Sequence, residues 1–376
     1  MGLKQLLSSV LLAAPLALAH PGHKEEVFQH AANPLERKSL DHCAREFSEP
    51  AFVKRTVEIH GEEYDRLRRQ LGLPPIKKRA LRPRDYISVS RIDHKSNKAV
   101  SKGMDVSTLF SDAGACMLMP VVDEGPLYVK GEQIRKDITE GEAGIKLTLV
   151  IQVVDYKTCK VVPNAFVDIW SSNSTGIYGG VQGYPGMGDP KDSSILKITT
   201  LRGVQPTDDH GIATFDGLMP GHYEGRATHI HAIVYLGGTR APNNTVINGK
   251  AAHIGQIYFD QSLITNADKI TPYNKNKMAI TLNTNDFLFR SGANGDDPIV
   301  RYNFVGSKLE DGLFAWIRFG INQNTVRPVN PAAFMTDKGG VMNPTGPVAA
   351  LNRGGGGFGG GFRPMAEEDD VEEEEA

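Results

Sequence analysis

The chain has 376 residues, of which 40% are hydrophobic, and its formal net charge at pH 7 is −2. A charge this close to zero gives no overall attraction to nucleic acid, and no segment after residue 19 is apolar enough to cross a membrane. Length and composition together favour one main folded domain with appendages over two domains of equal size.

Residues 1–19 have the three parts of a secretory signal peptide. Lys4 supplies a positive start, Leu6 to Leu18 form an apolar stretch too short to span a bilayer, and Ala19 closes a small-residue cleavage site. We therefore expect the mature protein to be secreted and to act outside the cell.

Residues 20–105 are predicted to form a basic, helical N-terminal arm and a linker. Apolar residues recur at helical spacing from Val53 to Leu71, and Gly72 ends the pattern. The arm either packs on its own domain or docks on a partner, which makes a homodimer possible. The dibasic stretch from Lys77 to Arg79 is a candidate site for proteolytic maturation.

Short strands separated by turns characterise residues 106–325. The segments 146–155, 164–170 and 212–216 alternate between apolar and polar residues, and Gly and Pro recur between them. This pattern predicts an all-β fold with a β-sandwich core. The segment 181–197, rich in Gly, Asp and Ser, is expected to be a surface loop.

Residues 326–376 are predicted to be a disordered C-terminal tail. The strand pattern is lost after Asn324, the segment 354–361 is rich in glycine, and the segment 367–375 is almost entirely acidic. Such segments cannot bury enough apolar surface to fold alone.

Two histidines in a predicted strand are the main candidates for chemistry. Side chains alternate along a strand, so His229 and His231 project from the same face. Tyr223 precedes a Gly-containing turn that could fold its phenol back over the pair, and Tyr178 ends the preceding strand-and-loop run. Two imidazole nitrogens and two phenol oxygens suit hard, high-valent iron better than zinc. A His-x-His pair alone is also common in strands without any metal.

An ordered series of motifs surrounds these residues. It includes Glu124-Gly-Pro-Leu-Tyr128, Val167-Asp-Ile-Trp170, Gly176-Ile-Tyr-Gly-Gly180, Pro220-Gly-His-Tyr223, Arg226-Ala-Thr-His-Ile-His231 and Gly255-Gln-Ile-Tyr-Phe259. Over roughly residues 106–325 the chain resembles the intradiol ring-cleavage dioxygenases, and most closely their secreted fungal members. The resemblance implies a β-sandwich of that type, in which two tyrosines and two histidines hold a non-haem Fe(III) ion. By position these ligands would be Tyr178, Tyr223, His229 and His231.

The resemblance also implies a reaction with catechols and O2. Tyr223 would leave the metal as the catechol arrives and accept its proton, while Arg226 and Gln256 would stabilise the anionic ring. The ring would open between its two oxygenated carbons to give a cis,cis-muconate-type diacid. The sequence does not rank catechol, protocatechuate, hydroxyquinol and larger plant diphenols as substrates.

Three cysteines and two glycosylation sequons fit an oxidising, extracellular compartment. The resemblance favours a disulfide between Cys116 and Cys159, which leaves Cys43 either buried and free or paired with another chain. The sequons at Asn173 and Asn243 predict a glycoprotein, and Asn243 lies in the more obvious loop.

Two other functions stay open at this point. One is a non-catalytic secreted β-sandwich that binds a ligand or a cell-wall component. The other is zinc-dependent hydrolysis, although no carboxylate or thiol near His229 obviously completes a zinc site. Three further histidines, His210, His222 and His253, are expected in turns or on the surface.

Overall fold

The computed structural model describes residues 43, 63, 64, 66–72, 86–96, 116, 117, 124–182, 191–293 and 297–353. The signal peptide, the dibasic site and the glycine-rich and acidic segments were predicted for residues outside this set, and they stay predictions. Among the described residues, none of the helices has the length and apolar character needed to cross a membrane.

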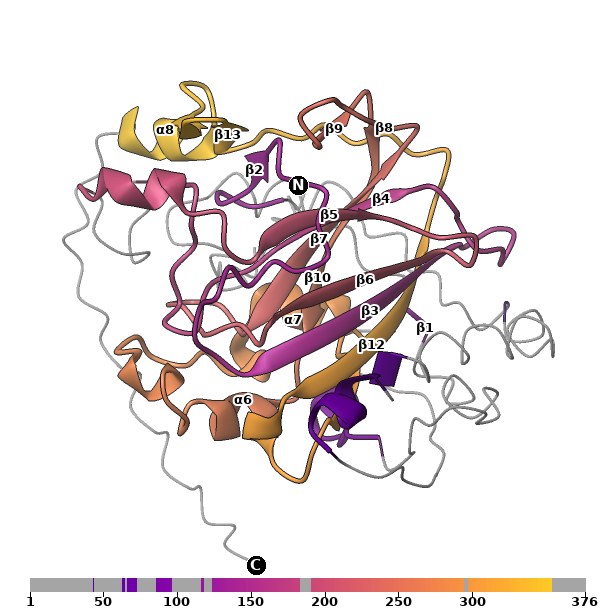
Figure 1. The fold of residues 1–376 in the computed structure, drawn as a ribbon, viewed down its shortest axis with the longest axis vertical. Coiled ribbons are helices and arrows are strands. Elements are labelled where there is room, and N and C mark those ends of the chain that lie inside the picture. The colour runs from indigo at the N-terminus through magenta and orange to yellow at the C-terminus, as the bar shows by residue number, and fades with distance from the viewer. Residues whose placement is uncertain are drawn as a thin grey trace, which may run out of the picture.

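The first of two large sheets has the strand order β1-β12-β3-β6, and β11 also pairs with β12. Its central strand β12 runs parallel to β3, and β3 runs antiparallel to β6. The strands are β1 (Cys116–Met117), β3 (Lys146–Asp155), β6 (Ile212–Leu218), β11 (Arg301–Phe304) and β12 (Leu313–Ile321). Figure 1 shows β3, β6 and β12 lying side by side across the middle of the molecule.

The second large sheet is antiparallel and has the strand order β10-β7-β4-β5. Its strands are β4 (Phe166–Trp170), β5 (Arg202–Pro206), β7 (His229–Leu236) and β10 (Lys250–Tyr258). In the register of this sheet, His231 lies opposite Trp170 on one side and opposite Gln256 on the other. The hydrogen-bonding pattern of the backbone therefore already brings three segments of the candidate site together.

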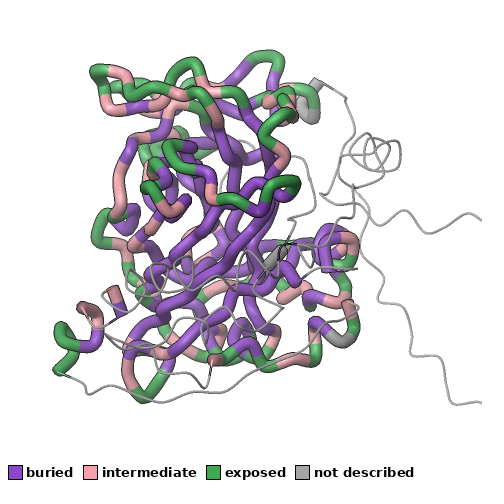
Figure 2. The backbone as a smooth tube through the Cα atoms, turned by 90° about the vertical axis from the view of Figure 1, so that its right-hand side faces the viewer, coloured by how far each residue is buried: buried purple, intermediate pink, exposed green. Residues whose placement is uncertain are grey.

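The main hydrophobic core lies between the two sheets. Ile230, Ala232 and Val234 of β7 belong to this core, together with residues of β3, β6 and β12. Full burial of an Ile or Val side chain contributes roughly 1.5–3 kcal/mol. Figure 2 shows the buried strands at the centre and the exposed loops around them. The predicted all-β sandwich is confirmed.

The alternation along β7 puts its two histidines on the opposite face from this core. Ile233 and Tyr235 share that second face and belong to a separate hydrophobic cluster. A small sheet with the order β14-β13-β2 contributes to the same cluster and covers this side of the sandwich. The candidate site therefore lies under the outer cover of the second sheet and not in the centre of the sandwich.

Short elements complete the fold. The strands are β2 (Val129–Lys130), β8 (Thr239–Arg240), β9 (Val246–Ile247), β13 (Ala333–Thr336) and β14 (Gly339–Met342). The α-helices are α4 (Tyr86–Ser90), α6 (Gln261–Ala267), α7 (Phe287–Gly292) and α8 (Pro347–Arg353), and the 3-10 helices are η3 (Ser193–Lys197), η4 (Tyr273–Lys275), η5 (Asn283–Asn285) and η6 (Leu309–Asp311).

Residues 326–353 are folded, although the sequence pattern assigned them to the tail. They include β13, β14 and α8, and Ala333 of β13 pairs with Val129 of β2. Ala332, Ala333 and Val348 are buried. Strands of four residues, one of which contains Gly339 and Gly340, are too short to show a convincing alternation, and this is why the sequence analysis missed them.

The described part of the N-terminal arm contacts the sandwich. Residues 63, 64 and 66–70 are helical, and the buried ring of Tyr64 packs edge-on against Phe314 with ring centroids 5.3 Å apart. The Tyr64 hydroxyl donates to the Phe304 carbonyl at 3.1 Å, and Arg68 Nη1 donates to the Val305 carbonyl at 2.8 Å. These contacts favour packing of the arm on its own domain, while the homodimer stays a prediction.

The disulfide prediction is wrong in one partner. Cys159 is bonded to Cys43 and not to Cys116. Cys43 and Cys159 are buried beside Tyr156, whereas Cys116 lies in β1 opposite Arg318 of β12. The bond joins residues 116 positions apart in the sequence, and no local pattern in the chain reveals such a contact.

We expect the variant Cys116→Ser to keep the disulfide and the variant Cys43→Ser to lose it. The loss should lower the free energy of unfolding by about 2–5 kcal/mol, because the unfolded chain is no longer cross-linked. Thiol alkylation without reduction, read by mass spectrometry, should find one reactive thiol in denatured wild type, none in Cys116→Ser and two in Cys43→Ser. Two thiols in Cys116→Ser and none in Cys43→Ser would contradict the pairing.

Candidate metal centre

The four predicted donors converge at one end of β7. His229 and His231 lie on that strand, Tyr223 lies in the turn before it, and Tyr178 lies in the loop after β4. The Nε2 atoms of the two histidines are 3.0 Å apart, and Tyr223 Oη is 3.4 Å from His229 Nε2. All four side chains are buried, with at most 3% of each residue exposed.

A tight turn places Tyr223 over the histidines. Tyr223 and Arg226 form an isolated antiparallel bridge, and between them Gly225 has φ = 81°. This left-handed conformation is strained for residues with a Cβ, but glycine adopts it readily. The turn reverses the chain so that the Tyr223 phenol lies beside the first histidine of the following strand.

Another glycine allows the Tyr178 loop to approach the same point. Gly176 has φ = 84°, and a Cβ at this position would lie only 2.2 Å from the carbonyl oxygen of His222. Only glycine can therefore occupy the position without moving one of the two segments. The rings of Tyr178 and Tyr223 then pack edge to face, with centroids 5.7 Å apart and an interplanar angle of 80°.

The orientation of both imidazoles is fixed by their neighbours. His229 Nδ1 lies 2.6 Å from the Ala227 carbonyl, so it carries the proton and leaves the Nε2 lone pair for a ligand. The ring of His231 stacks on Trp170, with centroids 4.7 Å apart and an interplanar angle of 6°. Two nitrogens that bind one metal at about 2.1 Å and at a right angle lie about 3 Å apart, which agrees with the observed separation.

The Tyr178 hydroxyl gives an independent test of whether a metal fits. It is a buried polar atom, and it has no hydrogen-bond partner within the part of the chain that the structure describes. Burial raises the pKa of Tyr178 well above the ordinary value, and the nearby Tyr223 adds to the increase. A phenolate can exist here only beside a strong cation, so a metal ion would satisfy both the orphaned oxygen and its charge.

The donor types indicate which kind of metal fits. Over the described ranges, no three His, Cys, Asp or Glu side chains group as a metal site, so the candidate centre relies on its two phenols. Phenol oxygens and imidazole nitrogens suit a hard, high-valent ion, whereas zinc sites are usually built from Cys, His and carboxylate. The structure brings the predicted donors together, and their role as iron ligands stays a prediction.

Arg226 lies beside the centre in a buried ion pair. Its Nε donates to Asp286 Oδ2 at 2.9 Å, and both side chains are at most 1% exposed. Burial alone would favour the neutral acid, but the Arg226 guanidinium and the nearby His229 hold the pKa of Asp286 below its ordinary value. Asp286 also accepts hydrogen bonds from the backbone amides of Ala227 and Phe289, so the carboxylate is fixed in place.

Gln256 is held by the same network. Its Oε1 accepts from Arg226 Nη2 at 2.5 Å and from Tyr258 Oη at 2.6 Å. These donors occupy the carbonyl oxygen, and Gln256 Nε2 is buried without a hydrogen-bond partner among the described residues. Because Gln256 lies opposite His231 in the sheet, its amide is available to donate to a molecule bound at the centre.

Sequence reasoning missed Asp286 and Tyr258. Asp286 caps the N-terminus of α7 and accepts from Phe289 N, so the local helix start was a possible signal. Its pairing with Arg226 could not be predicted from local sequence, because the two residues are 60 positions apart. Tyr258 shares a face with Gln256 because the two are separated by two positions in β10, but nothing in the pattern indicated that the two side chains interact.

Of the three further histidines that were expected in turns or on the surface, His222 and His253 are buried, so a surface position is wrong for both. His222 lies in the irregular segment before the turn, whereas His253 lies in β10. His253 packs against Phe319, and burial together with the nearby Arg327 lowers its pKa to about 3. His222 is 4% exposed, and its Nε2 lies 2.8 Å from the Met278 carbonyl. The burial of His253 has a local cause, because a β-bulge between Ala251 and His253 changes the alternation of side chains along β10. His210 is partly exposed in a turn, as expected.

Several solved structures are similar to this chain. An intradiol ring-cleavage dioxygenase from Tetranychus urticae is 33% identical, and the match covers 56% of this chain and 98% of that one with a TM-score of 0.47. A second dioxygenase structure is 32% identical over 57% of this chain and 98% of its own, also with a TM-score of 0.47. Structural neighbours of the chain are intradiol ring-cleavage dioxygenases.

A catechol 1,2-dioxygenase from Acinetobacter sp. ADP1, another intradiol enzyme in this set, is more distant. It is 22% identical, the match covers 57% of this chain and 68% of that one, and the TM-score is 0.34. No protein-family model and no curated protein matches the sequence.

We expect the substitution Asp286→Asn to destabilise the protein by about 3 kcal/mol, because it leaves the buried charge of Arg226 uncompensated. Urea denaturation followed by circular dichroism measures the change. The matched control is Asp209→Asn, which alters an exposed carboxylate and should change the free energy of unfolding by less than about 0.5 kcal/mol. Equal free energies of unfolding for the two variants would show that the ion pair does not stabilise the fold as we expect.

Proposed function

We propose that this chain is a secreted, Fe(III)-dependent intradiol dioxygenase that cleaves catechol-type rings with O2. The observation that carries the proposal is the convergence of two buried phenols and two buried imidazoles at the start of β7. The proposal is also supported by the solved structures similar to this chain, which are named as dioxygenases. A non-catalytic ligand-binding role would not require four metal-type donors in one buried place.

Tyr178, Tyr223, His229 and His231 would hold the iron. When bound, Fe(III) supplies a Lewis-acidic centre that chelates the deprotonated catechol and makes its ring reactive toward O2. The two imidazoles are pre-oriented by the Ala227 carbonyl and by Trp170, so little reorganisation is needed when the ion binds.

Tyr223 is the residue best placed to move a proton. It lies in a turn rather than within a strand, and its hydroxyl is 3.4 Å from His229 Nε2. As a phenolate it can accept a proton from one catechol hydroxyl and become a neutral phenol. Tyr178 is held more firmly, because its loop lies against the backbone of His222, and it would remain a fixed anionic donor.

Arg226 and Gln256 would stabilise negative charge on the substrate. Arg226 brings a positive charge to the edge of the site, and Asp286 and Tyr258 hold the network in position. The amide of Gln256 offers a hydrogen bond to an oxygen of the reacting ring. Because all these groups are buried, their interaction with a developing charge is stronger than it would be in water.

The overall reaction balances without a further reductant. Cleavage of the bond between the two hydroxylated carbons places one atom of O2 on each, so catechol gives cis,cis-muconic acid. The chain would therefore need only the catechol and O2 as substrates. The proposal makes no choice among catechol, protocatechuate, hydroxyquinol and larger diphenols.

Secretion and glycosylation are part of the same proposal. The sequence of residues 1–19 supports secretion, and the exposed Asn243 is a suitable acceptor for a glycan. Asn173 is less suitable, because its Nδ2 donates to Glu142 at 2.8 Å and its Oδ1 accepts from the backbone amides of Thr175 and Ile177. Intact and deglycosylated masses of the secreted protein test the cleavage site and the glycan together.

We expect iron-loaded protein to consume O2 with one or more members of a catechol panel and to give a product 32 mass units heavier than its substrate. The substitution Tyr223→Phe should lower the rate by at least about 100-fold, in the range of a lost general base. The control Tyr156→Phe removes a buried hydroxyl beside Cys159, away from the four donors, and should retain activity. Oxygen-electrode traces and product mass spectra provide the measurement.

Two results would contradict the proposal. One is the absence of O2 uptake on every catechol by protein that contains stoichiometric iron. The other is a Tyr223→Phe variant that turns over as fast as wild type, which would remove the assigned role of Tyr223.

A further inference from the structure

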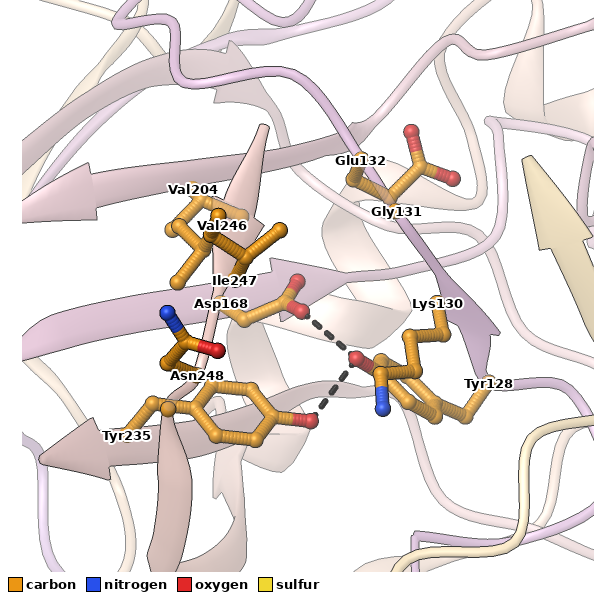
Figure 3. A pocket seen from close by; sticks show the side chains of 11 residues that line it. Tyr128, Lys130, Gly131, Glu132, Asp168, Val204, Tyr235, Val246, Ile247 and Asn248 are labelled. Carbon is orange, nitrogen blue, oxygen red and sulfur yellow. Dashed lines mark hydrogen bonds between the residues drawn. The ribbon is translucent and has the colours of Figure 1, made fainter. Parts of the chain in front are cut away.

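A separate pocket opens on the outer face of the second sheet. Its volume is about 180 Å³, enough for several non-hydrogen atoms, since one water takes up about 30 Å³ of liquid. Figure 3 shows side chains from β2, β4, β5, β7 and β9 around it. The lining residues are Tyr128, Lys130, Gly131, Glu132, Asp168, Val204, Tyr235, Val246, Ile247, Asn248 and Gly249, and none of the four candidate metal ligands is among them.

Two buried carboxylates line this pocket. Asp168 is 3% exposed and Glu132 is 1% exposed. Asp168 Oδ2 accepts from Tyr128 Oη at 2.9 Å, and the hydroxyls of Tyr128 and Tyr235 are 2.8 Å apart. Within the described part of the chain, Asp168 Oδ1 and both carboxylate oxygens of Glu132 are buried without a hydrogen-bond partner. Buried acceptors of this kind are costly unless a donor satisfies them.

The nearest cation compensates for only part of this charge. Arg202 Nε is 4.0 Å from Glu132 Oε1, which is too long for a hydrogen bond. Arg202 instead donates from Nε to the Gly179 carbonyl and from Nη2 to the Leu127 carbonyl, each at 2.8 Å. Arg202 Nη1 is itself buried without a hydrogen-bond partner among the described residues, so the guanidinium satisfies none of the orphaned carboxylate oxygens. Burial raises the pKa of Asp168 well above its ordinary value and that of Glu132 to about 7.

The solvent-facing part of the pocket has a different composition. Val204, Val246 and Ile247 provide apolar contacts, and Ile247, Asn248 and the cationic Lys130 are exposed to solvent. An occupant therefore meets acceptors and negative charge at the buried end and carbon atoms along the walls. A bare metal ion would satisfy the charge but would leave the apolar walls and most of the volume without contacts.

We propose that this pocket binds a small organic ammonium ligand, with its charged NH3⁺ group at the Asp168 carboxylate, in the electrostatic field of Glu132, and its carbon chain against Val204 and Val246. An ammonium group supplies three hydrogen-bond donors for oxygens that lack a partner among the described residues, and its positive charge favours the ionised form of the two acids. Lys130 at the opening disfavours a second positive charge on the ligand. Simple amines and amino acids share the required chemistry.

The pocket is distinct from the candidate metal centre. The Tyr128 ring packs at 4.8 Å from Trp170, and Trp170 in turn stacks on His231. These two rings separate the carboxylates from the four donors. The proposal does not depend on iron or on ring cleavage, so it can be tested on metal-free protein.

Isothermal titration calorimetry of the purified, metal-free protein tests the proposal with n-butylammonium as the probe. Neutral n-butanol, which has the same carbon chain, is the control ligand, and L-norvaline distinguishes an amino acid from a simple amine. We expect n-butylammonium to bind, n-butanol not to bind, and both Asp168→Asn and Glu132→Gln to weaken binding about tenfold or more. Glu310→Gln alters an exposed carboxylate elsewhere and should leave binding unchanged.

A blocking variant keeps the test valid if a carboxylate substitution impairs folding. Val246→Trp retains both carboxylates but fills the pocket space next to them. It should abolish binding, while a thermal melt shows an intact fold. Tighter binding of L-norvaline would identify an amino-acid site, and tighter binding of n-butylammonium an amine site; both support the proposal. Equal binding of n-butanol, no binding of either amine by wild type, or full binding by the two carboxylate variants would overturn it.

Discussion

The close approach of two imidazoles on one strand is the constraint on which the candidate centre depends. His229 and His231 lie on the same face of β7 with their Nε2 atoms 3.0 Å apart, away from water. Such an arrangement is favourable when a cation lies between the two lone pairs. The fold maintains it through a carbonyl that fixes one ring and an indole that stacks on the other.

Two buried groups of charged side chains lie near this centre, and only one of them pairs all of its charges within the described part of the protein. The Arg226–Asp286 pair is internally neutral and fully buried, so it adds no net charge next to the candidate metal ligands. It also fixes the carbonyl end of Gln256 and leaves the amide end for a substrate. The pocket lined by Asp168 and Glu132 is not balanced in this way. This contrast is the reason for proposing that a ligand completes the pocket.

Local periodicity predicted much of the fold and part of the site. The strand period of two placed both histidines on one face, and the glycine turn brought Tyr223 back to them. The pairing of Cys43 with Cys159 and of Arg226 with Asp286 depends on contacts between distant segments, which no local pattern encodes. The short strands of residues 326–353 were missed for a different reason, since four-residue strands carry almost no periodic signal.

The central claim is that two phenol oxygens and two imidazole nitrogens bind one ion. A crystal structure of iron-loaded protein, with anomalous diffraction measured on both sides of the iron absorption edge, tests it most directly. The account predicts a single iron peak within bonding distance of Tyr178 Oη, Tyr223 Oη and the Nε2 atoms of His229 and His231. A fully loaded protein whose iron peak lies elsewhere, or contacts fewer than three of these atoms, would contradict it.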